Sequence, residues 1–169
     1  SRVKEVLVAT EGKNAIIFFP SYALMDQVLG HLNVATLDRK ILKEQKFMTK
    51  EDKEKIVNEF RDTGSFDAKA RVLFAVTSGS FAEGLDLPED SLEAVVVVGL
   101  PLAVPDVFTT SVIRHFEKKF RKGELYGYVY PAMSKIIQAA GRCIRTEQDR
   151  GVVVLMDNRF LWPKYALSF

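Results

Sequence analysis

Short continuous apolar runs alternate along the chain with segments in which apolar residues recur every three or four positions. Continuous runs predict strands covered on both faces, whereas the three-to-four recurrence predicts amphipathic helices. The predicted strands cover residues 15–19, 34–37, 71–77, 94–98 and 152–156, of which 34–37 is the weakest. The predicted helices lie at the start of the chain, over residues 22–30, between Thr49 and Gly64, and over residues 106–121 and 132–145. This alternation predicts an α/β domain of three layers with a mostly parallel sheet.

Local signals mark the ends of two predicted helices. Thr49 and Asp52 have the spacing of a helix cap, and Ile56, Val57 and Phe60 then face inward. The helix over 106–121 begins after Pro105-Asp106 and ends before Gly123, and its phenylalanines are expected to form a core stripe. These are Phe108, Phe116 and Phe120. Its basic end is expected to be a solvated face favoured by the helix dipole, with an approach to DNA or a neighbouring domain as the alternative. That end comprises Arg114, His115, Lys118, Lys119, Arg121 and Lys122.

Composition limits the classes of protein that fit. The chain has 169 residues, 47% of them hydrophobic and 27% charged, which predicts a single globular domain over 1–169. A net charge of +2 excludes a general polyanion-binding surface, so any nucleic-acid contact must come from local clusters. The single Cys143 excludes an internal disulfide and a cluster held by several thiolates of this chain, and no metal site is predicted. With no long apolar stretch and no leader, no membrane contact is expected, and the location is expected to be cytoplasmic, or nuclear in a eukaryote.

Residues 138–145 read Gln-Ala-Ala-Gly-Arg-Cys-Ile-Arg and carry the most informative pattern. On a helix, Gln138, Gly141, Arg142 and Arg145 fall on one stripe. The opposite stripe is apolar and comprises Met133, Ile136, Ile137, Ala140 and Ile144. Two arginines three positions apart repel one another unless an anion lies between them, so the pattern predicts a site for a phosphate or carboxylate. A solvated basic face is the alternative.

Polar residues also follow the predicted strands, and ligands of parallel sheets bind where strands end. Ser21 and Tyr22 follow the first strand, while Thr77, Ser78, Gly79 and Ser80 offer hydroxyls and an open backbone that suit a phosphodiester. Glu83, Gly84 and Asp86 then place carboxylates around a tight turn, where they can accept hydrogen bonds from a sugar or orient arginines. For Tyr22, stacking on a base and packing at a helix start are equally favoured.

The chain has no phosphate-binding loop of its own. No Gly-x-Gly-x-x-Gly follows a strand, and Gly12-Lys13-Asn14 lacks both the upstream glycine and the following Ser or Thr of a P-loop. These three residues are therefore predicted to form a simple turn before the first strand.

Taken together, these segments resemble the second RecA-like motor domain of superfamily 2 helicases, and most closely the XPD and DinG group of DNA helicases. Residues 18–22 resemble motif IV, 77–86 resemble motif V and 138–145 resemble motif VI, while Leu155 to Phe160 resembles this group's closing segment. The resemblance implies a RecA-like domain within a longer polypeptide. Motif V commonly carries basic residues in this group, and the Thr-Ser-Gly-Ser at 77–80 departs from that pattern.

The resemblance also implies roles. ATP with Mg²⁺ would lie between this domain and a first RecA-like domain of the same polypeptide, and that domain would also carry the group's iron–sulfur cluster. Arg145 would be the arginine finger, with Arg142 at the γ-phosphate and Gln138 positioning phosphate or water. Gly84, Asp86 and Gly141 would line the nucleotide. Single-stranded DNA would follow Ser21, Tyr22 and residues 77–80, with movement 5′ to 3′ and a place in DNA repair.

Two other functions compete with this one. A non-catalytic RecA-like module that docks a protein or nucleic acid is disfavoured, because docking does not require Gln138, Arg142 and Arg145 together. An RNA helicase of the same superfamily is disfavoured by the Glu-Gly-x-Asp at 83–86 and the Asp-x-Arg-Phe at 157–160.

Overall fold

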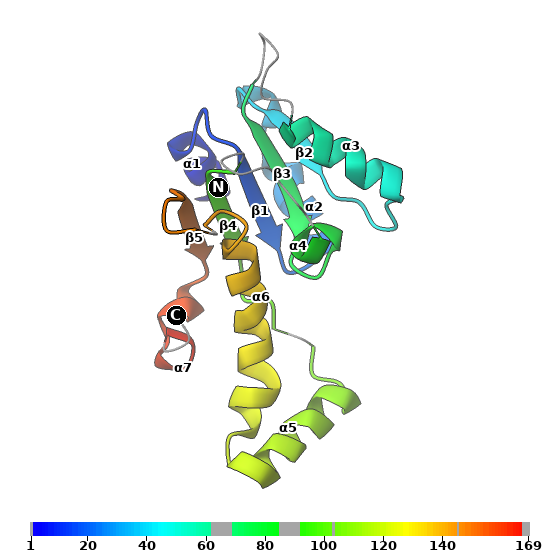
Figure 1. The fold of residues 1–169 in the computed structure, drawn as a ribbon, viewed down its shortest axis with the longest axis vertical. Helices are drawn as coiled ribbons and strands as arrows, with labels where there is room; N and C mark the ends of the chain where they lie inside the picture. Colours follow the sequence, from blue (N-terminus) through cyan, green and yellow to red (C-terminus); the bar gives the residue numbers. More distant parts are fainter. Residues whose placement is uncertain (1, 62–68, 85–91, 103, 145, 167–169) are drawn as a thin grey trace.

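The computed structural model describes residues 2–61, 69–84, 92–102, 104–144 and 146–166. Its centre is a five-stranded sheet in which neighbouring strands run parallel, in the order β2-β3-β1-β4-β5 (Figure 1). The strands are β1 (Ala15–Phe19), β2 (Lys40–Lys43), β3 (Arg71–Val76), β4 (Ala94–Val98) and β5 (Val152–Met156). The predicted α/β class with a parallel sheet is confirmed.

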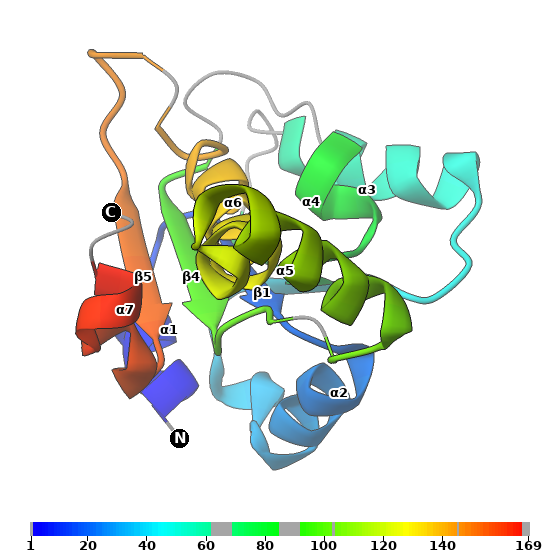
Figure 2. The ribbon, with the colours of Figure 1, turned by 90° about the horizontal axis from the view of Figure 1, so that it is seen from below.

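Helices cover both faces of the sheet and form the outer two layers (Figure 2). One face carries α1 (Arg2–Ala9) and α2 (Tyr22–His31), and the other carries α3 (Lys50–Arg61), α4 (Ser80–Gly84) and α6 (Tyr130–Ala140). The remaining elements are α5 (Val107–Phe120), α7 (Pro163–Ala166), the 3₁₀ turns η1 (Val34–Thr36) and η3 (Asn158–Leu161), and the π-helical segment η2 (Leu125–Val129). Within the described ranges, no helix has the length and apolarity needed to cross a bilayer.

The central strands are apolar throughout because helices cover both of their faces. Each residue of β1 and of β3 is buried, and so are the first four residues of β4. Side chains therefore alternate between two cores along β1. Phe18 packs with Phe60 and Phe81 on one side, and Phe19 packs with Phe74 and Met25 on the other.

The two edge strands differ from the predictions. Residues 34–37 do not form a strand, because the backbone N–H and the hydroxyl of Thr36 both donate to the carbonyl of Asn33 and close the turn η1. The strand beside β3 is instead β2, whose Lys-Ile-Leu-Lys sequence is only half-buried and gives no continuous apolar run. At the other edge β5 is also only partly buried, since it pairs with β4 alone.

The predicted cap of α3 is confirmed. The N–H of Asp52 donates to Oγ1 of Thr49 at 3.2 Å, and the N–H of Thr49 donates back to Oδ2 of Asp52 at 3.3 Å. Ile56 and Phe60 are buried and Val57 packs against the same core, as predicted. The predicted end at Gly64 lies outside the described residues.

The prediction that α5 contributes a core stripe is wrong. Asp106 caps the helix as expected, but none of its residues is buried, and Phe108 is 76% exposed. The helix extends beyond the end of the sheet (Figure 1), so no sheet surface lies beneath it. Phe116 and Phe120 pack instead on Tyr126 of η2, with ring centroids 5.9 and 5.5 Å apart.

The helix that begins the 138–145 segment ends earlier than predicted. α6 stops at Ala140, and residues 141–143 form a turn in which the N–H groups of Arg142 and Cys143 donate to carbonyls only three positions back. The buried stripe is consequently shifted from the predicted one: Met133 and Ile136 are buried as expected, whereas Ile137 is 54% exposed. The stripe comprises Ala132, Met133, Ile136, Ala139 and, beyond the helix, Cys143.

Candidate nucleotide and nucleic-acid sites

The loops after β1 and β3 lie side by side because these strands pair in parallel, with Phe19 opposite Val76. Thr77 joins the two loops: its backbone N–H and its hydroxyl both lie within hydrogen-bond distance of the Phe19 carbonyl, at 2.9 and 3.3 Å. Thr77 itself is buried, with 3% exposure. The structure thus brings the candidate residues of both loops together at the carboxyl edge of the sheet.

The polar groups that line this edge differ in exposure. Ser21, Ser78 and Ser80 are exposed, and Gly79 is partly buried. Ser21 is the N-cap of α2, and its Oγ accepts from the N–H of Leu24 at 3.2 Å. The exposed serines can donate hydroxyl hydrogen bonds, which suits backbone contacts rather than base recognition.

Glu44 lies behind this edge and was not among the predicted site residues. Although it has no exposed surface, its carboxylate accepts from the N–H of Val76 at 2.9 Å and of Ser80 at 2.6 Å. A Cβ on Gly79 would collide with both carboxylate oxygens, so glycine is the residue that fits there. Only its position just after the half-apolar β2 could have singled out Glu44, because the two N–H groups that it binds, those of Val76 and Ser80, lie more than 30 positions away in the sequence.

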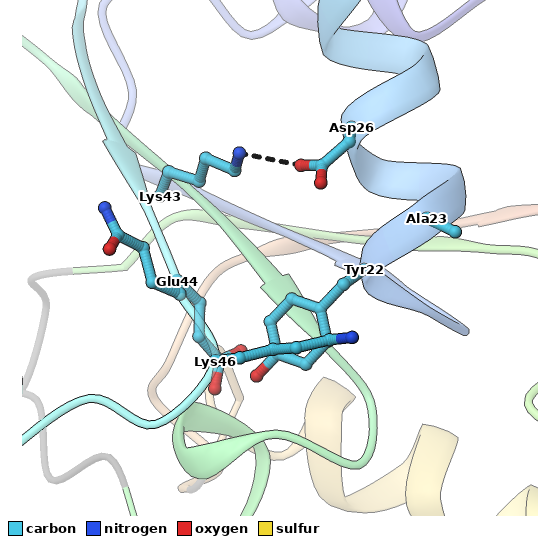
Figure 3. A pocket seen from close by; sticks show the side chains of 7 residues that line it. Tyr22, Ala23, Asp26, Lys43, Glu44 and Lys46 are labelled. Carbon is cyan, nitrogen blue, oxygen red and sulfur yellow. Dashed lines mark ion pairs between the residues drawn. The ribbon is translucent and has the colours of Figure 1, made fainter.

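Tyr22 lies beside the same carboxylate, and both residues line a pocket of about 420 Å³ (Figure 3). Burial and the neighbouring Glu44, which accepts a hydrogen bond from the tyrosine hydroxyl, together raise the pKa of Tyr22 above its ordinary value. The ammonium of Lys46 lies 5.6 Å from the centre of the tyrosine ring, and Lys43 pairs with Asp26 at 2.7 Å. Tyr22 is therefore half-buried and anchored, with a cation beside its ring.

The turn after α6 is tied to α4, which follows the loop after β3. Arg142 is half-buried, and its Nη2 donates to the carbonyl of Ala82 in α4 at 2.9 Å. Two segments 60 positions apart in the sequence, each predicted to contribute to one site, thus contact one another through a guanidinium.

The other candidate residues near the nucleotide site are placed as follows. Gln138 is exposed near the end of α6, and Gly141 follows that helix with its N–H donating to the Ile137 carbonyl at 2.8 Å. Gly84 is the last residue of α4. Arg145 and Asp86 lie outside the described residues.

Cys143 is structural rather than reactive. It is buried, its Sγ lies 3.4 Å from the carbonyl of Leu92, and burial raises the pKa of the thiol. The contact holds the turn after α6 against the start of β4. The end of α6 therefore lies toward the amino end of the strands, away from the loops that carry Ser21 and Ser78.

A parallel sheet between two layers of helices, with polar loops at its carboxyl edge, is an arrangement found in RecA-like domains. The family model for the helicase C-terminal domain matches residues 4–169, and the chain belongs to this family. The ATP-dependent DNA helicase XPD of Sulfolobus acidocaldarius is 30% identical over 158 residues, which cover 89% of this chain and 26% of that protein. The ATP-dependent DNA helicase DinG of Photobacterium profundum is 31% identical, over 92% of this chain and 22% of that protein.

Solved structures agree with the family assignment. An XPD helicase structure superposes with a TM-score of 0.72 and 25% identity, covering 99% of this chain and 29% of that one. The resemblance to the second motor domain of the XPD and DinG group is confirmed. The chain spans about a quarter or less of the length of the XPD and DinG relatives.

Proposed function

We propose that this chain is the second motor domain of an ATP-dependent DNA helicase that moves along a single strand, 5′ to 3′, in DNA repair. The observation that carries the proposal is the hydrogen bond from Arg142 to Ala82, because it links the turn beside the predicted nucleotide to α4, the helix that directly follows the loop beside the predicted DNA. A motor requires such a link, since the state of the nucleotide must change the grip on the strand. Family membership and the DNA helicases among the relatives support the same function.

The described residues fit a phosphate on the nucleotide side. Arg142 supplies a guanidinium and Gln138 an exposed amide, both of which donate hydrogen bonds to phosphate oxygens. Gly141, Gly84 and Asp86 would lie beside the nucleotide. ATP with Mg²⁺ would be held mainly by a first RecA-like domain of the same polypeptide, which would also carry an iron–sulfur cluster.

Arg145 is proposed as the arginine finger. Phosphoryl transfer spreads negative charge over the equatorial oxygens, and a guanidinium placed there stabilises the transition state. Such a residue contributes about 10³ to 10⁵ in rate, or roughly 4 to 7 kcal/mol of barrier. Arg142, whose Nη2 donates to the carbonyl of Ala82, is proposed to act beside Arg145 at the same phosphate.

On the nucleic-acid side, Ser21, Ser78, Gly79 and Ser80 are proposed to contact the backbone of single-stranded DNA. Thr77 would act by joining the two loops, since its hydroxyl is engaged by Phe19. Tyr22 would add its half-buried ring at the edge of the strand's path.

The test is an ATPase assay of the full-length polypeptide with and without single-stranded DNA. We expect DNA to stimulate hydrolysis more than RNA of the same length, and Arg145→Ala to abolish turnover while the protein still melts at the wild-type temperature. Gln148→Ala, three positions along the chain, exposed and outside the predicted site, is the matched control. Full turnover by Arg145→Ala, or equal stimulation by RNA, would contradict the proposal.

A further inference from the structure

Glu44 occupies an unusual position for a carboxylate. It is fully buried, yet it lies directly behind the loop that is proposed to face a polyanion. Its charge is balanced locally by the N–H groups of Val76 and Ser80 and by the hydroxyl of Tyr22. Burying a carboxylate costs free energy unless hydrogen-bond donors compensate for the lost water. The partners of Glu44 must therefore be held at fixed positions.

The contacts of Glu44 determine the shape of the loop. Val76 ends β3 and Ser80 begins α4, so one carboxylate grips both ends of the segment Thr77–Gly79. The backbone of Gly79 presses against the same carboxylate, with no room for a side chain between them. The conformation in which Ser78 and Ser80 are exposed is therefore held from behind.

Glu44 also connects this loop to the neighbouring one. The hydroxyl of Tyr22, which follows β1, donates to the carboxylate that binds Val76 and Ser80. Glu44 itself directly follows β2 and is held against β3, because its N–H donates to the carbonyl of Phe74 at 2.8 Å. Three strands thus converge on one side chain.

We propose that Glu44 is a positioning residue for single-stranded DNA: it fixes the Ser78–Ser80 loop and Tyr22 in one arrangement and so sets the affinity of this edge for the phosphodiester backbone. This inference rests on the function proposed above. Glu44 does not touch the strand. It acts through the loop. Because its carboxylate accepts hydrogen bonds from the N–H groups of Val76 and Ser80, the serine hydroxyls rather than those amides face the DNA.

The test compares variants of the full-length polypeptide for the Kd of an oligothymidylate and for ATP turnover at saturating oligothymidylate. Glu44→Gln keeps the volume but turns an amide NH₂ toward one of two backbone N–H donors, so one hydrogen bond is lost. We expect its Kd to rise about tenfold, as the loss of one charge-assisted hydrogen bond implies, with turnover at saturation within about twofold of wild type. Glu59→Gln, which removes a partly exposed carboxylate that pairs with Lys40 on α3's side of the sheet, should leave both values unchanged.

A second set of variants tests the loop by another route. Gly79→Ala forces a methyl group into the Glu44 carboxylate and should weaken DNA binding to a similar extent. In a Glu44→Ala background that methyl group has room, so adding Gly79→Ala should cost little more. Such non-additivity is expected of residues that act through one contact.

Each outcome is decisive. Three outcomes would overturn the inference while leaving the proposed function intact. Glu44→Gln could bind with wild-type affinity, or it could lose affinity and saturated turnover equally. The effects of Glu44→Ala and Gly79→Ala could also be additive in the double variant. If Glu44→Gln does not fold, Tyr22→Phe decides, because it deletes only the hydroxyl that donates to Glu44 and should raise the Kd about threefold. Failure of the wild-type protein to bind oligothymidylate would instead overturn the proposed function, and this inference with it.

Discussion

Asp157 offers a quantitative test of how the carboxyl edge of the sheet is held. It follows β5, and its side chain is 12% exposed. The carboxylate accepts from the N–H of Arg159 at 2.9 Å, capping η3, and from the N–H of Leu100 just beyond β4 at 3.3 Å. It also binds the guanidinium of Arg159, with Nη2 at 2.6 Å from Oδ2.

These contacts set the expected cost of Asp157→Ala. Each of the two backbone N–H groups left without its acceptor costs about 1 kcal/mol, because both lie at a partly buried edge. The ion pair adds no more than about 1 kcal/mol, because the Arg159 side chain is 37% exposed and solvent screens the interaction. We expect the free energy of unfolding to fall by about 2 to 3 kcal/mol at pH 7, as measured by urea denaturation of residues 1–169.

The pH dependence provides an independent check. Arg159 and the backbone donors lower the pKa of Asp157 below its ordinary value of about 3.9. A lowered folded-state pKa means that this stabilisation is complete above about pH 4 and is lost as pH falls through the folded-state pKa. The difference between wild type and Asp157→Ala should therefore be constant from pH 5 to 7 and shrink only below about pH 4.

Asp149→Ala is the matched control, since Asp149 caps an exposed turn by accepting from the N–H and the hydroxyl of Thr146. It should cost less than about 1 kcal/mol. A loss below 0.5 kcal/mol for Asp157→Ala, or a loss that grows on acidification, would refute the assignment of Asp157 as the residue that closes the β4–β5 edge.

Three further predictions concern stability, each measured by urea denaturation. Phe60→Ala should cost about 3 to 5 kcal/mol, because the side chain is fully buried between α3 and the sheet, whereas Phe47→Ala, at 99% exposure, should be neutral; equal effects would contradict the core assignment. Gly151→Ala should cost about 1 to 3 kcal/mol, because its methyl group would collide with Sγ of Cys143, and Cys143→Ala should relieve most of that added cost; no relief would show that the collision is not the cause. Asp106→Ala should lower the free energy of unfolding by removing the cap of α5, and Asp106→Asn should recover most of the loss; an identical loss in both would exclude capping.

The candidate site was predictable where its residues are close together in the sequence. Residues 77–80 follow a strand that is recognisable from its apolar run alone, and parallel strands place such loops at one edge. Gln138, Gly141 and Arg142 have a spacing short enough to be read directly. Their relation to the loop after β3 was not readable, because the bond from Arg142 to Ala82 spans 60 positions.

Predictions from local sequence were also wrong for α5, which does not pack on the sheet, and for the edge strand β2. The helical period of Phe108, Phe116 and Phe120 was read correctly, but a period states only that a helix has an apolar face, not what covers it. Because α5 projects beyond the sheet, Phe116 and Phe120 pack on Tyr126 of η2 and Phe108 remains exposed. The edge strand β2 begins and ends with lysine and was not predicted, since only a strand buried on both faces is expected to be apolar throughout.

By itself the sequence determined the class of fold, the positions of the central strands along the chain and the cap of α3. Hydrophobic period and capping act over fewer than ten residues, so both can be recognised locally. The tertiary structure decided where α6 ends, which faces stay exposed and, above all, that Glu44 lies behind the Ser78–Ser80 loop. That last arrangement depends on β2 pairing with β3. A contact that forms because two strands pair leaves no local sequence pattern, since the residues on its two sides are brought together by the sheet and not by their neighbours along the chain.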